Sequence, residues 1–544
     1  MQATMMQVPL NLCHFLERAG KLFGSAEIVS RMPDKSIHRS TYADLHRRAR
    51  LLAQALQQAG LRKGERVATL MWNHYAHFES YMGAIASGGV LHTLNLRLAP
   101  EEIGFIADHA QDRFLIVDDI LLPLFEQFRE HTRIEQVIVV PLTGRPVPAP
   151  YIDYEAFLAR ADGDWDYPPM DENDPIAMCY TSGTTGRPKG VVYSHRSQVL
   201  HTLAQCMPDA VGISGRDTIL PVVPMFHANA WGIPYAACML GSRIVFPGPH
   251  LHPDDLLPLL EQEQVTIACG VPTIWLGLIQ LLEREPGRWK FDSRLRLTVG
   301  GSAVPESLIR AYARQGIELV QGWGMTETSP LATISKATQC QDGIGEDERF
   351  SLLASQGYPI PLVDLRIAGD EGEQPWDGQA VGEIQVRGPW ITGGYHALAQ
   401  SQDSFTADGW LRTGDVAAVT PHGFVRITDR TKDLIKSGGE WISSVDLENA
   451  IMGHPCVAEA AVIAVPHPKW AERPLAVIVA RQGAALTAED MRAFLAQRFV
   501  KWMVPDAYAF VDAIPRTSTG KFLKSALRER YRDWRWDDAA SSPG

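Results

Sequence analysis

A short segment rich in glycine, threonine and lysine constrains the fold of this 544-residue chain more than any other feature. Residues 180–190 read YTSGTTGRPKG, and they lie between an apolar run, IAMCY, and the segment VVYSHRSQVL. The apolar run predicts a buried strand, and Ser194 can cap a helix that follows. Glycines let the backbone amides of such a loop approach an anion closely. The segment therefore predicts a phosphate-binding loop.

The side chains of this loop favour the same interpretation. The hydroxyls of Thr181, Thr184 and Thr185 can donate hydrogen bonds or ligate Mg²⁺, and Lys189 supplies a positive charge. The loop is not a Walker A motif, because the spacing between its glycine and its lysine does not fit. A turn that contacts no ligand is the alternative, and the coincidence of hydroxyls, glycines and lysine disfavours it.

The hydrophobic pattern alternates between helices and strands. Thr41 can cap a helix whose apolar residues recur at steps of four, three and four, Gly60 ends that helix, and residues 67–71 form a short apolar run. The next segment again places an expected helix, MGAIASGG, before an expected strand, VLHTLN. Such alternation predicts an α/β architecture in which helices cover the strands.

The pattern changes near residue 430. Three short apolar runs (460–465, 475–480 and 507–511) follow, with a helix between the last two for which Thr487 provides a cap. This pattern predicts a small α+β domain, joined by a polar, basic junction. The predicted organisation is a large N-terminal domain (1–429), a hinge (430–436) and a C-terminal domain (437–544).

Charge and cysteine content exclude several classes of protein. The formal net charge is −12 and no sustained Lys/Arg cluster occurs, so nucleic acid is not expected as a partner. The seven cysteines contain no CxxC pair, which disfavours a disulfide framework or a zinc site and favours a cytoplasmic protein. The sequence shows neither a signal peptide nor an apolar run of 18 residues, so we expect no integral membrane segment.

The loop at 180–190 resembles the signature loop of the adenylate-forming superfamily, which includes acyl-CoA synthetases, luciferases and peptide-synthetase adenylation domains. Further segments resemble that family's motifs in the same order: GGSA (300–303), QGWGMTE (321–327), WLRTGD (410–415), KSGGEW (436–441) and PRTSTGK (515–521). The resemblance covers nearly the whole chain. It implies a large adenylation domain with a small mobile domain, and it implies ATP, Mg²⁺, coenzyme A and a carboxylic acid as ligands.

The resemblance also implies which residues bind the nucleotide and the metal. Glu327 is a hard oxygen ligand, and with Thr181 it would hold Mg²⁺. Asp415 would accept hydrogen bonds from the ribose hydroxyls, and Lys432 stands at the family's hinge position. The implied ATP-site residues are Thr181, Ser182, Gly183, Thr184, Thr185, Lys189, Gly301, Ser302, Gln321, Gly322, Trp323, Thr326, Asp415, Arg430, Lys432 and Trp441.

Two lysines have implied roles in successive half-reactions. Lys521 would bridge the carboxylate and the α-phosphate during adenylation, where it stabilises developing charge. Lys436 is the residue that the resemblance assigns to thioester formation. The implied coenzyme A contacts are Gly438, Gly439, Glu440 and Glu472.

The segment MFHANAWG (225–232) bears on the acid that is activated. Its His227 and Trp231 are four residues apart, so on a helix they would share a face. We expect His227 to position the substrate rather than to act as a base, because a carboxylic acid is already ionised at pH 7. Trp323 is larger than the tyrosine common in the family, which favours a short pocket. The predicted acyl wall is His227, Ala228, Trp231, Trp323 and Pro330.

The predicted function is an ATP-dependent acyl-CoA ligase for short- to medium-chain fatty acids. The segment 225–232 resembles medium-chain ligases and 3-methylmercaptopropionate ligases equally, so the latter stays open. A non-catalytic nucleotide or acyl-CoA sensor is a more distant alternative, which the presence of Thr181, Glu327 and Lys521 disfavours. By analogy with related ligases, a homodimer is an alternative to a monomer.

Overall fold

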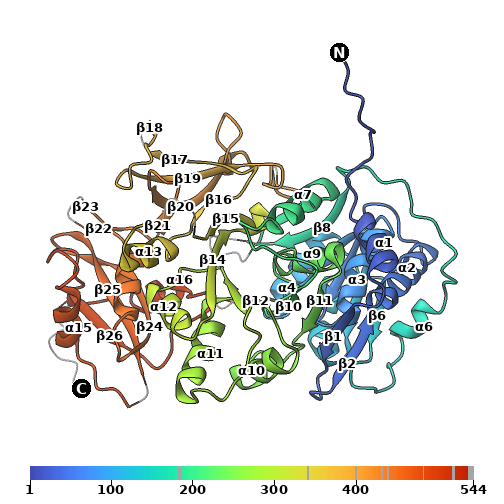
Figure 1. Cartoon of the computed structure of the whole chain (residues 1–544), viewed down its shortest axis with the longest axis horizontal. Coiled ribbons are helices and arrows are strands. Elements are labelled where there is room, and N and C mark those ends of the chain that lie inside the picture. The colour runs from blue at the N-terminus through green and yellow to red at the C-terminus, as the bar shows by residue number, and fades with distance from the viewer. Residues whose placement is uncertain are drawn as a thin grey trace.

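The structure is a computed structural model that places most of the chain. It describes residues 1–181, 187–337, 339, 342–369, 371–398, 401–430, 433–437, 440–481, 483–517 and 521–536, without the side chains of Ser401, Gln402, Glu440 and Trp441. Within these residues, four β-sheets carry the fold: three in the N-terminal part and one near the C-terminus. Figure 1 shows the C-terminal part, in orange and red, beside the larger N-terminal body.

The first sheet carries the phosphate loop. Its strands pair in parallel except for β8 and β9, which form an antiparallel hairpin around that loop. Every residue of β5 is buried, as expected for a parallel sheet covered on both faces. In spatial order the strands are β7 (Ile152–Asp153), β6 (Gln136–Val140), β5 (Phe114–Asp118), β3 (Arg66–Leu70), β4 (Val90–Thr93), β8 (Pro175–Tyr180) and β9 (Gly190–Ser194).

The second sheet is mostly parallel at its centre. Its strands β12, β13 and β14 end in the segments that follow residues 270, 299 and 324, and ligands of open α/β sheets bind at such carboxyl ends. In spatial order the strands are β16 (Tyr358–Pro359), β15 (Leu331–Ser335), β14 (Glu318–Gly324), β13 (Arg296–Val299), β12 (Ile267–Gly270), β10 (Thr218–Pro221), β11 (Arg243–Phe246), β1 (Glu27–Arg31) and β2 (Ile37–Thr41).

The third sheet is antiparallel and lies at the top of the view in Figure 1, above the C-terminal domain. Its last two strands place residue 415 opposite residue 430. The two segments that carry residues 415 and 430, both predicted in the ATP site, are therefore neighbours at this sheet. The order is β18 (Gly372–Glu373), β17 (Asp364–Gly369), β19 (Val381–Arg387), β20 (Leu411–Val419) and β21 (Val425–Arg430).

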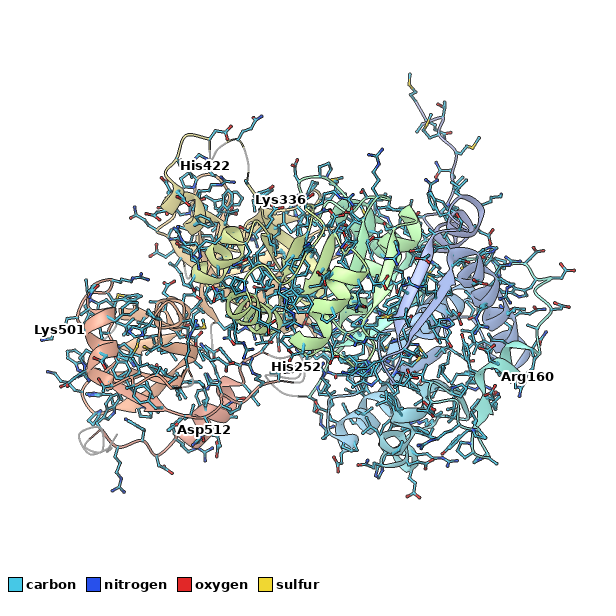
Figure 2. All side chains as sticks on the ribbon, turned by 60° about the horizontal axis from the view of Figure 1, so that its bottom comes forward. Arg160, His252, Lys336, His422, Lys501 and Asp512 are labelled. Atoms are coloured by element: carbon cyan, nitrogen blue, oxygen red, sulfur yellow. The ribbon has the colours of Figure 1, made fainter. Side chains whose placement is uncertain are left out.

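The fourth sheet belongs to the smaller C-terminal domain and has a core of its own. Figure 2 shows Lys501 and Asp512 on this domain, at the opposite end of the molecule from Arg160. The three predicted apolar runs are strands β24, β25 and β26. The sheet has the order β23 (Glu440–Ile442), β22 (Ile435–Ser437), β25 (Ala471–Ala480) and β24 (Val457–His467), and β26 (Ala507–Phe510) pairs with β25.

Helices cover these sheets, and the predicted caps are confirmed. The hydroxyls of Thr41 and Thr487 accept hydrogen bonds from the amides of Asp44 and Asp490. The carboxylates of these two aspartates accept in turn from the backbone amides of the two threonines, which completes two capping boxes. No helix among the described residues combines the length and the apolar character needed to cross a membrane. The helices are α1 (Cys13–Leu22), α2 (Tyr42–Gln58), α3 (Tyr75–Ala86), α4 (Pro100–Ala110), α5 (Leu122–Glu126), α6 (Tyr154–Leu158), α7 (His195–Gln205), α8 (Ala228–Trp231), α9 (Ile233–Leu240), α10 (Pro253–Gln262), α11 (Pro272–Arg284), α12 (Glu306–Arg314), α13 (Glu346–Leu353), α14 (Ser444–Met452), α15 (Ala488–Leu495) and α16 (Lys524–Arg530).

Candidate active site

One cavity of about 730 Å³ collects residues from segments that are far apart in the sequence. It is lined by parts of the second and third sheets, by the base of the phosphate loop and by the C-terminal domain. The predicted site residues that line it are Thr181, Lys189, His227, Trp231, Gly301, Ser302, Gln321, Gly322, Trp323, Thr326, Glu327, Pro330, Asp415, Arg430 and Lys521.

Some predicted residues lie outside the described part of the chain or away from this cavity. Of those described, Lys436 and Glu472 lie together in the C-terminal sheet, where the Lys436 amide donates to Glu472 Oε2 (2.9 Å). The structure therefore places one lysine of the predicted pair at the cavity and the other elsewhere. Ser182, Gly183, Thr184, Thr185, Lys432, Gly438 and Gly439, and the side chains of Glu440 and Trp441, lie outside the described residues.

The base of the phosphate loop is closed by hydrogen bonds. Tyr180 and Gly190 pair at the ends of β8 and β9. The Thr181 amide donates to the Lys189 carbonyl (2.9 Å), and the Lys189 amide donates to Thr181 Oγ1 (3.1 Å). A Cβ atom on Gly190 would lie 3.1 Å from the Tyr180 ring, so any larger residue would have to shift that ring, and glycine avoids this. The loop is thus held at both ends beside the cavity.

Glu327 is a buried carboxylate next to that base. The Tyr395 hydroxyl donates to Glu327 Oε1 (2.8 Å), and the Lys189 ammonium lies 4.7 Å from the centre of the Tyr395 ring. Burial raises the pKa of Glu327, and the hydrogen bond from Tyr395 opposes this shift, as do the charges of Lys189 and Lys521. A cation bound here would stabilise the charged carboxylate further.

Asp415 has partners on both of its carboxylate oxygens. Arg430 Nε lies 3.2 Å from Asp415 Oδ1, and the Trp323 indole N–H donates to Asp415 Oδ2 (2.9 Å). A carboxylate offers about four acceptor positions, so this one can still accept from two ribose hydroxyls. Trp323 is predicted both in the ATP site and in the acyl wall, and its N–H points to Asp415.

Replacing Trp323 with phenylalanine separates these two roles. Trp323→Phe keeps an aromatic ring but removes the hydrogen bond to Asp415, and hydrogen bonds to charged groups contribute about 1.5–3 kcal/mol. We expect the KM for ATP to rise about tenfold with little change in the preferred acid, in initial-rate measurements. A changed acid preference with an unchanged KM for ATP would contradict the assignment.

Gly300 and Gly301 lie where the segment at residues 300–303 meets the segment at residues 321–327. A Cβ on Gly300 would lie 2.9 Å from the Gly322 carbonyl oxygen and 3.4 Å from the Trp231 ring. Gly301 has φ +93°, which side chains rarely adopt, and a Cβ there would lie 3.5 Å from Lys521 Cε. Gly300 therefore allows the close approach of the Gly322 backbone, and Gly301 supplies a positive φ where the segment contacts Lys521.

Lys521 enters the cavity from the C-terminal domain. Its amide donates to Thr517 Oγ1 (3.1 Å), and the Thr517 amide donates to the Lys521 carbonyl (2.7 Å). Burial lowers the pKa of Lys521 to about 8, the charge of Arg430 adds to this, and Asp415 and Glu327 oppose it. A lysine in this position can form an ion pair with an anionic ligand in the cavity.

A chain of contacts that the sequence did not reveal fixes the Lys521 segment. Lys524, three residues on, donates to Ser444 Oγ (2.6 Å) and lies 2.7 Å from Glu448 Oε1. The Ser444 amide in turn donates to Asp429 Oδ2 in β21 (2.8 Å). Helices α14 and α16 are therefore tied to the third sheet in the arrangement that holds Lys521 in the cavity.

The acyl segment corrects one expectation from the sequence. We expected His227 and Trp231 to share a face of a helix, whereas α8 is a left-handed turn. Residues 228–231 have φ between 43° and 58°, and Gly232 has φ 74°. Left-handed helical backbone costs about 1–2 kcal/mol per residue with a side chain, so surrounding structure must impose it. Both predicted side chains nevertheless line the cavity, while Ala228 is buried in the turn.

Hydrogen bonds on either side of the turn supply that constraint. The Met225 amide donates to the buried Asn73 Oδ1 (2.8 Å), and the Gln205 side-chain amide donates to the Gly232 carbonyl (3.2 Å).

Burial lowers the pKa of His227 to about 3, with a further contribution from Lys521, so its imidazole is neutral. A neutral ring in this position can hydrogen-bond a carboxylate without removing a proton.

Tyr395, Lys524 and Gln205 are among the cavity residues that the sequence did not single out. Tyr395 follows a Gly-Gly pair, which signals a turn but not the contact of its hydroxyl with Glu327. Lys524 and Gln205 sit in ordinary helical segments. No local pattern distinguishes them, because their roles arise from the packing of other elements against them.

The geometry places the C-terminal domain against a cavity that is rich in charged side chains, and comparisons with known proteins give the family. The family described as AMP-binding enzyme matches residues 16–396, and the AMP-binding enzyme C-terminal domain matches residues 446–521. The chain belongs to the AMP-binding enzyme family.

Relatives of known name match almost the full length. The chain is 50% identical over 535 residues to a long-chain-fatty-acid–CoA ligase of Thermus thermophilus (98% of this chain, 97% of the relative). It is 43% identical to a 3-methylmercaptopropionyl-CoA ligase of Ruegeria pomeroyi (98% and 99%) and 42% identical to a medium-chain-fatty-acid–CoA ligase of Ectopseudomonas oleovorans (98% and 98%).

Solved structures share the fold. ATP-bound MatB from Rhodopseudomonas palustris superposes with a TM-score of 0.82 at 26% identity, covering 97% of this chain and 99% of that one. The anthranilate CoA ligase AuaEII with anthranoyl-AMP gives a TM-score of 0.86 at 23% identity, covering 98% and 99%. At that identity the second comparison supports the fold alone.

Proposed function

We propose that the chain activates short- to medium-chain fatty acids as acyl-adenylates and passes the acyl group to coenzyme A. It is an AMP-forming acyl-CoA ligase that uses ATP, coenzyme A and a carboxylic acid. The observation that carries the proposal is the meeting, in one cavity, of Lys521, the buried Glu327, the paired Asp415 and the Trp231 wall. We assign Asp415 to the ribose of ATP, Glu327 to the metal on its phosphates, Lys521 to the reacting centre and Trp231 to the acyl chain.

Adenylation follows from these positions. The substrate carboxylate attacks the α-phosphorus of ATP, and pyrophosphate leaves. Asp415 accepts from the ribose hydroxyls, and His227 orients the carboxylate. Lys521 lines the same cavity. We assign to it contacts with both the carboxylate and the α-phosphate, through which it stabilises the charge that builds between them. Positioning and charge supply most of the catalysis.

Glu327 and Thr181 fit a hard divalent cation such as Mg²⁺. Both present oxygen donors to the same cavity, and burial of Glu327 favours a cation beside it. When bound, Mg²⁺ would neutralise charge on the ATP phosphates. Lys189, stacked on Tyr395, adds a second positive charge on the same side.

Thioester formation requires a different set of residues. We assign it to Lys436, Glu472 and the 438–441 segment, after the C-terminal domain turns near Lys432 and Lys521 leaves the cavity. Lys436 is exposed and lies in the C-terminal sheet while Lys521 occupies the cavity, which is the distribution that two alternating states need. The domain bounds at 429 and 437 are part of the same proposal.

A second substrate fits the same wall. 3-Methylmercaptopropionate differs from a short fatty acid by a thioether in place of a methylene, and the two differ little in shape or polarity. A relative named for that substrate matches this chain about as well as a medium-chain ligase does. The mechanism is the same for both acids.

Release of AMP with a panel of acids tests the proposal. The purified protein is incubated with ATP, Mg²⁺ and coenzyme A, and with straight-chain acids from acetate to palmitate, 3-methylmercaptopropionate, benzoate and several amino acids. We expect AMP and acyl-CoA to appear together, with a maximum at short to medium chains. A maximum at 3-methylmercaptopropionate would select the second substrate. Tight ATP binding with no AMP from any acid would support a sensor instead.

Lys521 also predicts a pH dependence. Adenylation needs its ammonium, and the pKa of this group is lowered to about 8 in the free protein. We therefore expect kcat/KM for ATP to be constant below that pH and to fall as pH rises through it. In Lys521→Arg the charge persists to much higher pH, so the alkaline fall should disappear although the rate is lower. A fall that persists in this variant would assign it to another group.

A further inference from the structure

Part of the cavity wall belongs neither to the nucleotide motifs nor to the predicted acyl wall. It comprises Gln205 at the end of α7, Val211 in the loop that follows, Ile233 at the start of α9, Cys269 in β12 and Thr298 in β13. This lobe adjoins the acyl wall, because Gln205 is hydrogen-bonded to the residue after Trp231. We take it as the continuation of the acyl pocket.

The lobe is apolar apart from Gln205 and the Thr298 hydroxyl. Val211, Ile233 and Cys269 are buried, and burial raises the pKa of Cys269 to about 12, so its thiol stays neutral. Such a surface suits methylene groups. Gln205 contrasts with it, because its side chain brings a primary amide to the wall while the residue is 1% exposed.

Gln205 is anchored rather than free to swing aside. Its Nε2 donates to the Gly232 carbonyl (3.2 Å), which holds the side chain, and its backbone carbonyl accepts from the Gly212 amide (3.1 Å), which holds the main chain at this end of the helix. A Cβ on Gly232 would lie 3.2 Å from Gln205 Nε2, so the backbone and the amide are in close contact. Moving the amide would leave a buried carbonyl without its donor, which costs free energy.

We propose that Gln205 limits the acyl chain length that this enzyme accepts. This inference rests on the proposed function. A chain that reaches the amide must either displace it from Gly232 or cover its polar atoms with methylenes, and both are unfavourable. Acids that end before Gln205 avoid both penalties. The side chain therefore separates short- and medium-chain substrates from longer ones.

Truncation of Gln205 tests the inference. We would measure kcat/KM for straight-chain acids from butanoate to dodecanoate in the wild type, Gln205→Ala and Gln205→Leu. Alanine removes four heavy atoms, so we expect the longest well-used acid to gain about two or three methylenes, each improving kcat/KM about fourfold. Leucine fills much of the same space without polar atoms, so it removes the polar penalty and keeps most of the obstruction, and its upper limit should lie between those of the wild type and Gln205→Ala.

The matched control is Leu203→Ala, on the exposed side of the same helix, which should leave the profile unchanged. Thermal unfolding of each variant is measured in parallel, and Gln205→Ser serves as a second truncation if alanine unfolds the protein. An active truncated enzyme with the wild-type profile would overturn the inference while leaving the proposed function intact. If the wild type releases AMP with no straight-chain acid, the proposed function itself fails.

Discussion

Replacing Lys521 with alanine is expected to slow adenylation by about 100- to 1,000-fold, which is the cost of removing one preorganised donor to a developing charge. The ammonium lies in a cavity with Glu327, Asp415 and Arg430, and its lowered pKa shows that this site alone does not compensate its charge. The bound phosphate and carboxylate supply the missing anions, so the stabilisation appears when they react. Acyl-adenylate formation is measured without coenzyme A.

The second half-reaction provides the contrast. With a synthetic acyl-adenylate and coenzyme A, Lys521→Ala should form thioester within about twofold of the wild-type rate, because the proposed thioester state does not use this lysine. Lys436→Ala is the matched variant and should show the opposite pattern, since Lys436 lies in the C-terminal sheet away from the cavity. Equal loss of both half-reactions in either variant would rule out this division of roles.

The fold was predictable where local chemistry decides it. The Thr41 and Thr487 capping boxes and the apolar runs at 460–465 and 475–480 depend on neighbouring residues, and the structure confirms them. The pairing order of the strands was not predictable, because β14 and β15 join others through contacts that no local pattern encodes. The distribution of motifs along the chain still indicated that distant segments must converge on one ligand.

The site divides in the same way. Thr181, Glu327 and Asp415 stand in segments that resemble the family's motifs, and they line one cavity. The turn at residues 228–231 was missed because it contains no glycine and only one residue, Asn229, that tolerates left-handed backbone. The anchors that impose this turn come from distant segments. The local sequence therefore predicted a right-handed helix where the structure has a left-handed turn.

The sequence likewise showed no sign of the contact between Tyr395 and Glu327, and this contact decides which substitution isolates the negative charge of Glu327. We expect Glu327→Gln to slow adenylation by about 100-fold and to raise the Mg²⁺ concentration needed for half-maximal rate. Glutamine keeps an acceptor for the Tyr395 hydroxyl and nearly the same volume, so the loss isolates the negative charge. The measurement is the rate of acyl-adenylate formation across a Mg²⁺ titration.

Tyr395→Phe is the matched control, because it removes the hydrogen bond to Glu327 Oε1 (2.8 Å) and keeps the ring beneath Lys189. A single hydrogen bond to a charged group contributes about 1.5–3 kcal/mol at most when its loss leaves the partner buried, and a cation on the carboxylate replaces part of it. We therefore expect a loss of only about fivefold at saturating Mg²⁺. Equal losses in both variants, with an unchanged Mg²⁺ requirement in Glu327→Gln, would mean that Glu327 orders Tyr395 and Lys189 and does not hold the metal.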